Sequence, residues 1–279
     1  MVYLVTGARS GIGLLTAITL ARAGHTVYAG LRDPATDEGL RAAGAGCDLR
    51  PIALDVSQPA DCTAAVARIL AEQGRIDGLV NNAGVALGGF LEQIDDDELR
   101  RLFDVNVFGL WDLTCKVLPT MRAQRSGCVV HVTSMAGRLS MPGLGAYAAS
   151  KWAVEGMAEA WRHELRPFGV RMCLIEPGPY KTDIFGRNRT MARRAALPDG
   201  PNAARTRALD AIAARMTDRL AGDPQEVADR ILELLTDYNP PLRVPIGPTA
   251  HLRLALRLLL PWSALEALVA RLTAGGGDT

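Results

Sequence analysis

The sequence predicts an α/β protein in which helices cover both faces of a doubly wound parallel sheet of about seven strands. Two observations support this fold class: short apolar segments alternate with helical ones, and a glycine-rich turn joins the first strand to the first helix. Short apolar strands joined by helices are typical of parallel sheets that are buried on both faces. At 279 residues the chain can bury a large core without a second domain, so we expect one domain over residues 1–279.

The apolar segments are predicted to be strands, and the regular helices lie between them. The last strand is placed at the sheet edge, because prolines flank it and proline cannot donate to a strand ladder. Asp223 is the expected N-cap of the last regular helix. The strands are expected at 2–5, 26–29, 52–54, 78–80, 128–132, 170–175 and 241–246. The helices are expected at 11–23, 61–73, 95–123, around Tyr147 as far as Pro167, and at 224–236.

Composition and charge exclude several classes of function. The formal net charge of +1 offers no electrostatic argument for a nucleic-acid partner. The five cysteines and four histidines are scattered, without a Cys-x-x-Cys pair, which disfavours a metal site or a disulfide framework and fits a reducing compartment. We therefore expect a cytoplasmic protein without a metal.

The chain is also expected to lack a transmembrane span. A strand begins at Val2, which leaves no room for a signal peptide. In the apolar stretch 252–272 the longest uncharged run, 258–265, is too short to cross a bilayer, which needs about 20 apolar residues. Peripheral contact of this stretch with a membrane, lining of a pocket and burial between subunits stay open beside simple packing.

Residues 6–13, Thr-Gly-Ala-Arg-Ser-Gly-Ile-Gly, lie between the first strand and the first helix. Glycines at such a turn let the backbone approach a pyrophosphate closely, and the N-terminus of the helix supplies amide donors. The spacing is Gly-x-x-x-Gly-x-Gly rather than the commoner Gly-x-Gly-x-x-Gly, but strand, glycines and helix follow in the required order. The turn predicts a Rossmann-like dinucleotide site formed by Gly7, Arg9, Ser10, Gly11, Ile12 and Gly13.

The end of the second strand indicates which dinucleotide binds. An acidic residue there would bind the ribose hydroxyls and repel a 2′-phosphate, whereas this chain has Gly-Leu-Arg at 30–32. Arg32 could pair with a 2′-phosphate, and Arg9 could reach the same group. Asp33 is a counter-signal, although it precedes a proline and could cap a turn. The balance favours NADP(H) over NAD(H).

Tyr147 and Lys151 are four residues apart on a predicted helix and project from the same face. A neighbouring ammonium group favours the phenolate and is expected to lower a phenol pKa that is normally about 10. A tyrosine tuned in this way donates and accepts protons near neutrality. The pattern alone is weak, but Ser134 lies thirteen residues upstream of Tyr147 and the glycine-rich turn accompanies it. The combination predicts proton-transfer chemistry.

The chain resembles the short-chain dehydrogenases/reductases over nearly its whole length. Segments 29–33 and 240–243 look like the branch that contains hydroxysteroid and retinol dehydrogenases. Two details depart from the common NADP-type pattern: the basic residue of the turn is at position 9 rather than 10, and the C-terminal segment is longer than the minimal fold needs. The shared elements are the turn 6–13, Asp55-Val56, the Asn-Asn-Ala-Gly at 81–84, Asn106, Ser134, Tyr147-x-x-x-Lys151 and Pro177-Gly178-x-x-x-Thr182.

The resemblance implies an NADP(H)-dependent oxidoreductase that interconverts a ketone or aldehyde and an alcohol. Tyr147 would be the general acid/base, and Lys151 would tune it and hold the nicotinamide ribose. Ser134 would hydrogen-bond the substrate oxygen, and Asn106 would continue a proton relay through water to Lys151. The other cofactor contacts would come from Asp55 and Val56 at the adenine, from Asn82, Ala83 and Gly84 at the ribose, and from Pro177, Gly178 and Thr182 at the nicotinamide.

The looser pattern after Pro179 indicates how the single domain is divided, and the resemblance implies how it assembles. Residues 1–184 would form the cofactor-binding and catalytic core, and the arginine-rich residues 185–222 a helical substrate lid. Residues 223–248 would hold the last helix and strand, and residues 249–279 an apolar extension and tail. A homodimer or homotetramer would form through the helices that bear Asn106 and Tyr147.

Several of these residues have plainer interpretations. Ser134 could cap a turn, Asp55 could cap the next helix, and Asn106 could face solvent from its helix. His131, in an apolar strand, is expected to be a core histidine with a backbone partner. The acidic run at 95–98 is expected to be a helix start matched to the helix dipole.

The substrate is the least defined part of the prediction. Arginines at 187, 189, 193 and 194 leave a carboxylate or phosphate substrate open, but the loops expected around the reacting carbon favour an apolar one of medium size. The runner-up function is an NAD-dependent hydroxysteroid- or retinol-type dehydrogenase. Alternatives of another class are a catalytically silent dinucleotide-binding protein and a protein that reaches a membrane or partner through its C-terminal stretch. The apolar loop residues are Leu87, Leu139, Met141, Leu144, Tyr180 and Phe185.

Overall fold

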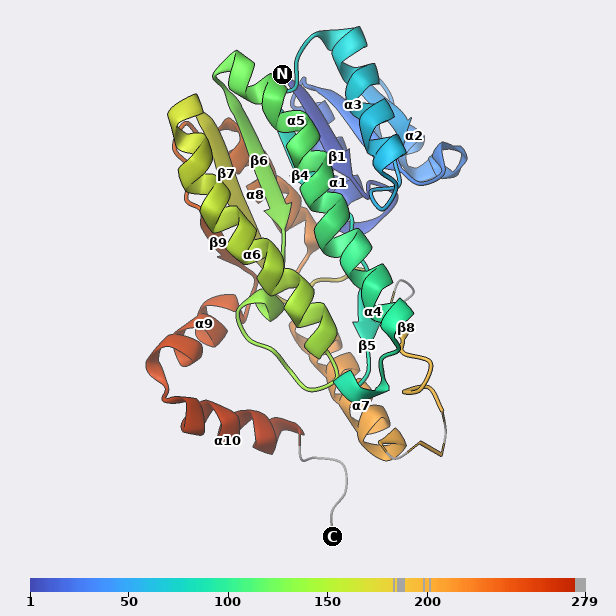
Figure 1. Ribbon diagram of the computed structural model, residues 1–279, viewed down its shortest axis with the longest axis vertical. Coiled ribbons are helices and arrows are strands. Elements are labelled where there is room, and N and C mark those ends of the chain that lie inside the picture. The colour runs from blue at the N-terminus through green and yellow to red at the C-terminus, as the bar shows by residue number, and fades with distance from the viewer. Residues whose placement is uncertain (183, 185–188, 198, 201, 274–279) are drawn as a thin grey trace.

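A computed structural model of the chain describes residues 1–182, 184, 189–197, 199–200 and 202–273. Helices and strands alternate along the chain, and the strands lie in the centre with helices on either side (Figure 1). Phe185 and Arg187, two of the residues expected near the substrate, lie outside the described part of the chain.

The centre of the molecule is one parallel sheet. Its strands are β1 (Val2–Thr6), β2 (Thr26–Leu31), β3 (Leu49–Ala53), β4 (Gly78–Asn81), β6 (Gly127–Val132), β7 (Val170–Pro177) and β9 (Arg243–Ile246). They lie in the order β3-β2-β1-β4-β6-β7-β9, and all neighbours are parallel. The order reverses between β1 and β4, which confirms the predicted doubly wound sheet. In such sheets a ligand crevice lies outside the carboxyl ends of the strands at the reversal.

Helices cover both faces of this sheet (Figure 1). Their bounds are α1 (Gly11–Arg22), α2 (Glu38–Ala43), α3 (Pro59–Gln73), α4 (Asp96–Phe103), α5 (Leu110–Gln124), α6 (Gly145–Leu165), α7 (Ala203–Leu220) and α8 (Pro224–Thr236). Buried side chains of α3, α5 and α6 form one core cluster with the sheet, and those of α1 and α8 form another on the opposite face. The two clusters hold the carboxyl ends of the strands in fixed register.

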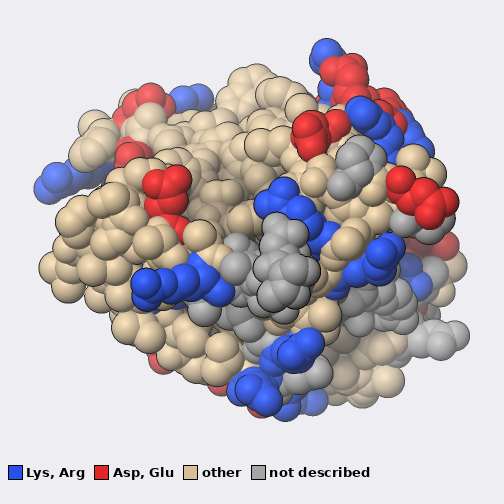
Figure 2. Space-filling view, turned by 90° about the horizontal axis from the view of Figure 1, so that it is seen from below, with Lys and Arg blue, Asp and Glu red and all other residues tan. Residues whose placement is uncertain are grey.

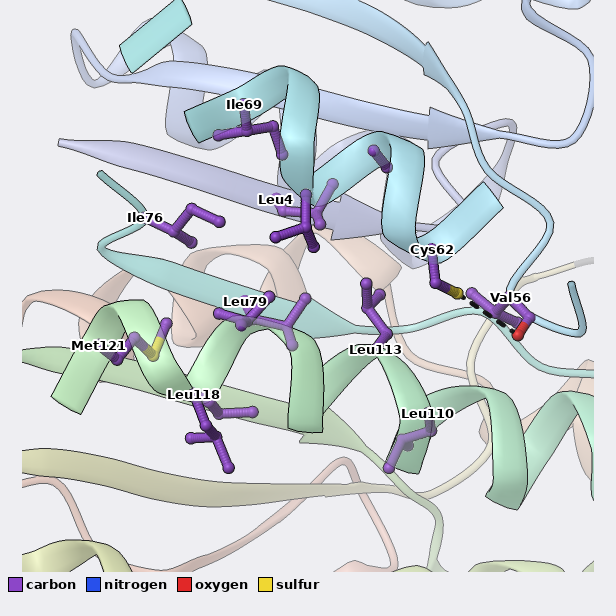
Figure 3. Close-up of a cluster of buried hydrophobic side chains, with 14 of the residues drawn as sticks. Leu4, Val56, Cys62, Ile69, Ile76, Leu79, Leu110, Leu113, Leu118 and Met121 are labelled. Carbon is purple, nitrogen blue, oxygen red and sulfur yellow. Dashed lines mark hydrogen bonds between the residues drawn. The ribbon is translucent and has the colours of Figure 1, made fainter. Parts of the chain in front are cut away.

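The core beneath α3 and α5 explains why α5 forms. Leu110, Leu113, Val117 and Met121 recur every three or four residues and are buried against the sheet. Figure 3 shows three of them, Leu110, Leu113 and Met121, around Leu79 of β4. Full burial of a side chain of this size contributes about 1.5–3 kcal/mol. This stripe, rather than intrinsic helix propensity, stabilises the helix.

Most predicted boundaries lie within a few residues of the observed ones. α8 spans the predicted residues, and its N-cap Asp223 accepts a hydrogen bond from the Gln225 backbone at 2.9 Å. β9 pairs with β7 alone, which confirms the predicted edge position, where Pro245 is tolerated. β3 begins three residues earlier than expected, at Leu49, because its first residues already pair with β2.

The predicted helix at 95–123 is interrupted in the structure. α4 ends at Phe103, and a π-helical segment, Asp104–Gly109, separates it from α5. At Gly109 a Cβ would lie 2.3 Å from the carbonyl oxygen of Val56, so the loop after β3 approaches the helix backbone at this point. Apolar periodicity does not reveal a single wide turn of this kind, which is common at functional sites.

Two further parts of the fold differ from the sequence prediction or extend it, and one is a strand within residues 185–222, where a helical lid was expected. A small second sheet pairs β5 (Ala86–Gly88) with β8 (Arg189–Met191), and both strands are too short for a readable pattern. The C-terminal extension forms α9 (Ala250–Leu259) and α10 (Trp262–Thr273). Within the described ranges, no helix combines the length and the apolar content that crossing a bilayer requires.

Leu113→Ala tests the packing between α5 and the sheet. Leu113 is fully buried, so its truncation should lower the free energy of unfolding by about 2–5 kcal/mol. The matched control is Leu197→Ala, because Leu197 is 55% exposed and its loss should change stability by no more than about 0.5 kcal/mol. Urea unfolding followed by circular dichroism measures both values. Equal losses would contradict the described core.

Candidate active site

The glycine-rich turn has the backbone geometry of an anion site. Gly7 has a φ of +66°, which lets the chain leave β1 in a tight turn. At Gly13 a Cβ would lie 2.3 Å from Asn82 Nδ2 and 2.4 Å from the Gly7 carbonyl oxygen, so no side chain fits. α1 begins at Gly11 with Ser10 as N-cap, and the Ser10 side chain makes no capping hydrogen bond. The N-terminal amides of α1 therefore face an open turn, which fits a dinucleotide pyrophosphate.

Thr6 and Asn82 fasten this turn to the end of β4. The Thr6 hydroxyl accepts hydrogen bonds from the backbone amides of Asn82 (3.0 Å) and Ala83 (2.9 Å). The Asn82 side-chain amide donates to the carbonyl oxygens of Thr6 (3.0 Å) and Gly7 (3.2 Å). The side chain of Asn82 is thus already used to position the turn. The expected contacts of residues 82–84 with a ribose stay a prediction.

The loop after β7 lies opposite the turn. Thr182, expected at the nicotinamide, has its side chain 3.5 Å from the position of a Cβ on Gly11. Gly178, which follows Pro177 at the end of β7, donates from its backbone to the Ile246 carbonyl oxygen at 2.9 Å. The structure therefore brings the two most distant predicted cofactor segments to the same edge of the sheet.

Arg9 and Arg32 lie on adjacent segments beside the turn. The backbone amide of Ala8 donates to the Gly30 carbonyl oxygen at 3.1 Å, so the turn runs next to the end of β2. Both arginines are exposed, and within the described part of the chain neither forms an ion pair. The Asp33 carboxylate accepts from the Ala35 backbone at 2.9 Å, which confirms that it caps a turn. Two cations at this position fit an additional phosphate on the adenosine ribose.

Asp55 was also interpreted as a cap of the next helix, and the structure agrees with this in part. Its carboxylate accepts hydrogen bonds from the backbone (3.0 Å) and hydroxyl (2.7 Å) of Ser57, so it shapes the turn before α3, whose N-cap is Gln58. Val56 is buried and its carbonyl oxygen accepts from the thiol of Cys62 at 3.7 Å (Figure 3). The expected adenine contact of both residues stays a prediction.

Ser134 and Tyr147 meet at the carboxyl end of β6. Tyr147, in the first turn of α6, is 2% exposed, and Ser134 lies close enough to its phenol to favour the ionised form. Ser134 also accepts from the Ala136 backbone at 3.1 Å and so caps a short helix at Met135–Gly137. The cap interpretation of Ser134 is therefore confirmed, and its catalytic role stays a prediction.

Lys151 is buried one turn after Tyr147, with its ammonium near the Tyr147 ring. Its ammonium donates to the Val132 carbonyl oxygen at 3.1 Å and lies 5.7 Å from the ring centroid. Burial lowers the pKa of Lys151 to about 8. Burial raises the pKa of Tyr147 to about 12, and Ser134 opposes that rise. Desolvation therefore decides the phenol pKa, which is raised and not lowered as the spacing of Tyr147 and Lys151 predicts.

Asn106 faces the interior, so its solvent-facing interpretation is wrong. It lies in the π-helical segment and is 1% exposed. Its side-chain oxygen accepts from the Val85 backbone at 2.9 Å, and its amide donates to the Val85 carbonyl oxygen (3.0 Å) and the Ser150 hydroxyl (3.1 Å). A Cβ on Gly84 would lie 3.3 Å from Asn106 Oδ1 and 3.6 Å from Lys151 Nζ. Asn106 and Lys151, the predicted relay partners, thus both lie close to Gly84. The water path between them stays a prediction.

A buried charge cluster behind Lys151 has no counterpart in the sequence analysis. Glu155 (4% exposed) and Glu176 (1% exposed) both hydrogen-bond Arg243, Glu176 at 2.7 Å, and Arg138 lies 3.9 Å from each. Glu155 stands one turn after Lys151, and its charge opposes the lowering of the Lys151 pKa. Burial and the neighbouring Glu176 raise the pKa of Glu155. The sequence could have indicated part of this cluster, because Glu155 lies four residues after Lys151 on the same helix.

His131 is buried as expected, but its partner is a side chain and not the backbone. Nδ1 lies 3.1 Å from the Asn81 amide nitrogen. Burial, with a smaller contribution from the charge of Lys151, lowers the pKa of His131 to about 3, so the ring is neutral. Within the described ranges, no three His, Cys, Asp or Glu side chains are placed to hold a metal ion.

The acidic run at 95–98 starts a helix, as predicted. The Asp95 backbone donates to Glu98 at 3.0 Å in a capping box, and Arg193 pairs with Asp95 and Asp97. Arg189 pairs with Asp210 of α7 at 2.7 Å. Two of the arginines considered for an anionic substrate are therefore engaged within the protein.

A cavity of about 460 Å³ lies between the segment before α4 and the loop before Tyr147. Met141, one of the predicted apolar residues, lines it together with Phe90, Leu91 and Pro142. Tyr180 was expected near the substrate, but it packs in the core beside α8, where its hydroxyl donates to Glu226 at 3.0 Å. Its position differs from the expectation because Gly222 and Gly247 leave space for the ring.

Comparisons with known proteins agree with this arrangement. A family model described as short chain dehydrogenase matches residues 1–193. The oxidoreductase YusZ of Bacillus subtilis is 38% identical over 274 residues, which cover 96% of each chain. A 3-ketodihydrosphingosine reductase of Bacteroides thetaiotaomicron is 34% identical over 254 residues, covering 91% of this chain and 90% of that one. A crystal structure of a short-chain dehydrogenase from Streptomyces avermitilis is similar with a TM-score of 0.80 at 35% identity, covering 98% of this chain and 96% of that one.

Glu155→Gln tests the buried charge cluster through the pH dependence of stability. The folded state holds the Glu155 proton to a higher pH than the unfolded chain, where the carboxyl pKa is about 4.3. The stability from this group is complete below that value and is lost as the pH rises through the raised folded pKa. Each tenfold difference in proton affinity between the folded and unfolded states corresponds to about 1.4 kcal/mol in the free energy of unfolding. Glu155→Gln should abolish the loss of stability that accompanies the rise in pH.

Urea unfolding across this pH range measures the effect. Glu159→Gln is the matched control, because Glu159 also bonds Arg243 but is 56% exposed, and that bond lowers its pKa. Its contribution therefore has the opposite sign and is lost as the pH falls. The same pH dependence for the parent and Glu155→Gln would contradict this account.

Proposed function

The chain belongs to the short-chain dehydrogenase/reductase family, and on that premise we propose that it is an NADP(H)-dependent oxidoreductase interconverting a ketone or aldehyde and an alcohol. The single observation that carries the proposal is that Ser134 lies close enough to the buried phenol of Tyr147 to influence its pKa, with the buried Lys151 near the ring. This group opens beside a glycine-rich turn that fits a dinucleotide. A catalytically silent sensor would have no need of it.

The bound nicotinamide dinucleotide supplies or accepts the hydride. Residues of the chain supply the proton that the carbonyl oxygen receives. Because burial holds the pKa of Tyr147 near 12, the phenol is protonated at neutral pH, the form that donates a proton to a carbonyl oxygen. Ser134 hydrogen-bonds the same oxygen and holds it within reach of the phenol. The positive charge of Lys151 near the ring stabilises the phenolate that remains after the transfer.

Arg9 and Arg32 support the choice of NADP(H). Both are exposed cations next to the turn, and the one acidic competitor at the end of β2, Asp33, caps a turn. Guanidinium groups bind phosphate through paired hydrogen bonds. An NAD-dependent enzyme would be expected to place an acidic side chain here for the ribose hydroxyls.

The cavity before Tyr147 supports an apolar substrate of medium size. Phe90, Leu91 and Met141 line it together with the polar residues Glu92 and Ser140, and Arg205 of α7 lies over the Phe90 ring at 5.1 Å. We propose that α7 acts as the substrate lid and residues 1–184 as the catalytic core. The name of the Bacteroides thetaiotaomicron relative, a reductase of a keto group on a sphingoid base, supports reduction of an apolar ketone.

A homodimer or homotetramer is the proposed assembly. Phe108, Trp111 and Trp152 are 57%, 48% and 47% exposed, and they lie on the π-helical segment, α5 and α6. These are the helices that bear Asn106 and Tyr147. Large exposed aromatic side chains on neighbouring helices are typical of a surface that another subunit covers.

Tyr147→Phe should abolish most of the turnover. Loss of the general acid should lower kcat for ketone reduction by about 10²–10⁴-fold, while the affinity for NADPH changes little. Steady-state kinetics on a panel of apolar ketones and alcohols, with binding measured by nucleotide fluorescence, separates the two effects. Tyr238→Phe is the control, because Tyr238 is 95% exposed. Turnover that survives in the folded Tyr147→Phe variant would refute the proposed chemistry.

Arg32→Ala should weaken NADPH more than NADH. Removing one guanidinium from a phosphate should cost about tenfold or more in the Kd of NADPH and leave NADH nearly unchanged. Isothermal titration of both nucleotides gives the ratio. Arg22→Ala is the control, since Arg22 is an exposed arginine at the far end of α1. An equal loss for both nucleotides would defeat the assignment to NADP(H).

A further inference from the structure

Three helices beyond the carboxyl ends of the strands carry an excess of positive charge. α7, α9 and α10 together hold seven arginines and three acidic residues, a net charge of +4, whereas the whole chain has a net charge of +1. α7 and α10 contact each other, so the charges share one end of the molecule. Figure 2 shows this end from below: Lys and Arg side chains surround its middle and lower part, and most Asp and Glu side chains lie in its upper half.

The corner between α9 and α10 exposes large apolar side chains. Leu258 is 70% exposed, Leu259 80% and Trp262 63%, and Leu252 on α9 is 61% exposed. The chain turns at Pro261; α9 starts against β9, and α10 lies further from the sheet (Figure 1). Leu265, in contrast, is 2% exposed, so α10 is anchored on one side while the corner projects. An exposed apolar group of this size is uncommon unless something binds it.

Arginine side chains lie next to this apolar corner. The Arg257 guanidinium lies 5.6 Å from the centroid of the Trp262 ring. Within the described residues, Arg257 forms no ion pair, Arg253 is half-buried, and Glu266 is the only acidic residue of the two helices. Each of these side chains suits one layer of a bilayer surface. Leucines suit the boundary of the acyl chains, the indole ring of Trp suits the headgroup level, and Arg suits the phosphates.

We propose that the face formed by α7, α9 and α10 docks on an anionic lipid bilayer. Leu258, Leu259 and Trp262 enter the boundary between headgroups and acyl chains, and the arginines of the three helices attract the anionic headgroups. Apolar insertion and electrostatic attraction together give reversible binding of amphipathic helices at a membrane surface. Peripheral attachment of this kind requires no spanning helix.

A second copy of the chain matches this face less well. A twofold contact would place the same positive face against itself, and like charges across an interface are unfavourable. The aromatic side chains of Phe108, Trp111 and Trp152 offer a subunit contact on α5 and α6, away from α9 and α10. The charge distribution therefore selects a lipid surface over self-association as the occupant.

Co-sedimentation with vesicles tests the proposal. The parent chain should bind vesicles of phosphatidylcholine with 30% phosphatidylglycerol at least about tenfold more tightly than pure phosphatidylcholine vesicles, and salt should weaken the binding. The double variant Leu258→Ser/Leu259→Ser should bind the anionic vesicles at least about tenfold more weakly. Arg257→Gln should lose about fivefold on anionic vesicles only.

Two control variants separate specific from general effects. Tyr238→Ser removes a 95% exposed aromatic side chain that precedes β9, at the opposite end of the sheet, and Arg166→Gln removes an exposed arginine at the same distant end. Both should bind like the parent. The proposal is overturned if the parent binds neither vesicle, binds both equally, or binds no better than the double-serine variant. A loss of oligomer mass in that variant without vesicle binding would instead assign the face to a second copy. None of these readouts depends on turnover.

Discussion

The buried ammonium of Lys151 is the constraint on which the site depends. A charged amine in a protein interior is costly unless hydrogen bonds and opposite charge compensate it. The Val132 carbonyl oxygen supplies the hydrogen bond, and Glu155, one turn further along α6, supplies the charge. These contacts fix α6 against the end of β6. Because Ser134 follows β6 directly and Tyr147 precedes Lys151 by one turn, the same contacts set the distance between their hydroxyls.

Burial also decides the protonation of the phenol. A lysine near a tyrosine suggests a low phenol pKa, but the structure buries Tyr147 and directs the ammonium to a backbone carbonyl. Desolvation is then the larger effect and raises the pKa of the phenol. A phenol that keeps its proton at neutral pH is prepared to protonate a carbonyl oxygen.

The arginines of the C-terminal half fall into two groups that composition alone does not distinguish. Arg189 and Arg193 pair with acidic side chains and fasten the segment before α7 to the body of the protein. Arg243 holds two buried carboxylates together behind the site. The arginines of α9 and α10 have no such partners in the described part of the chain and accompany exposed leucines. The first group is structural, and the second is suited to an anionic surface.

The sequence by itself determined the sheet and the glycine-rich turn and singled out Ser134, Tyr147 and Lys151 as candidates, because these depend on local spacing and apolar periodicity. It could not determine where Asn82 or Asn106 point, because their partners, Thr6 and Val85, are 76 and 21 residues away in the chain. Nor could it reveal the Glu155–Glu176–Arg243 cluster, which joins three segments of the fold. Only the tertiary structure decided these contacts and the protonation of the phenol, because burial is a property of packing and not of spacing.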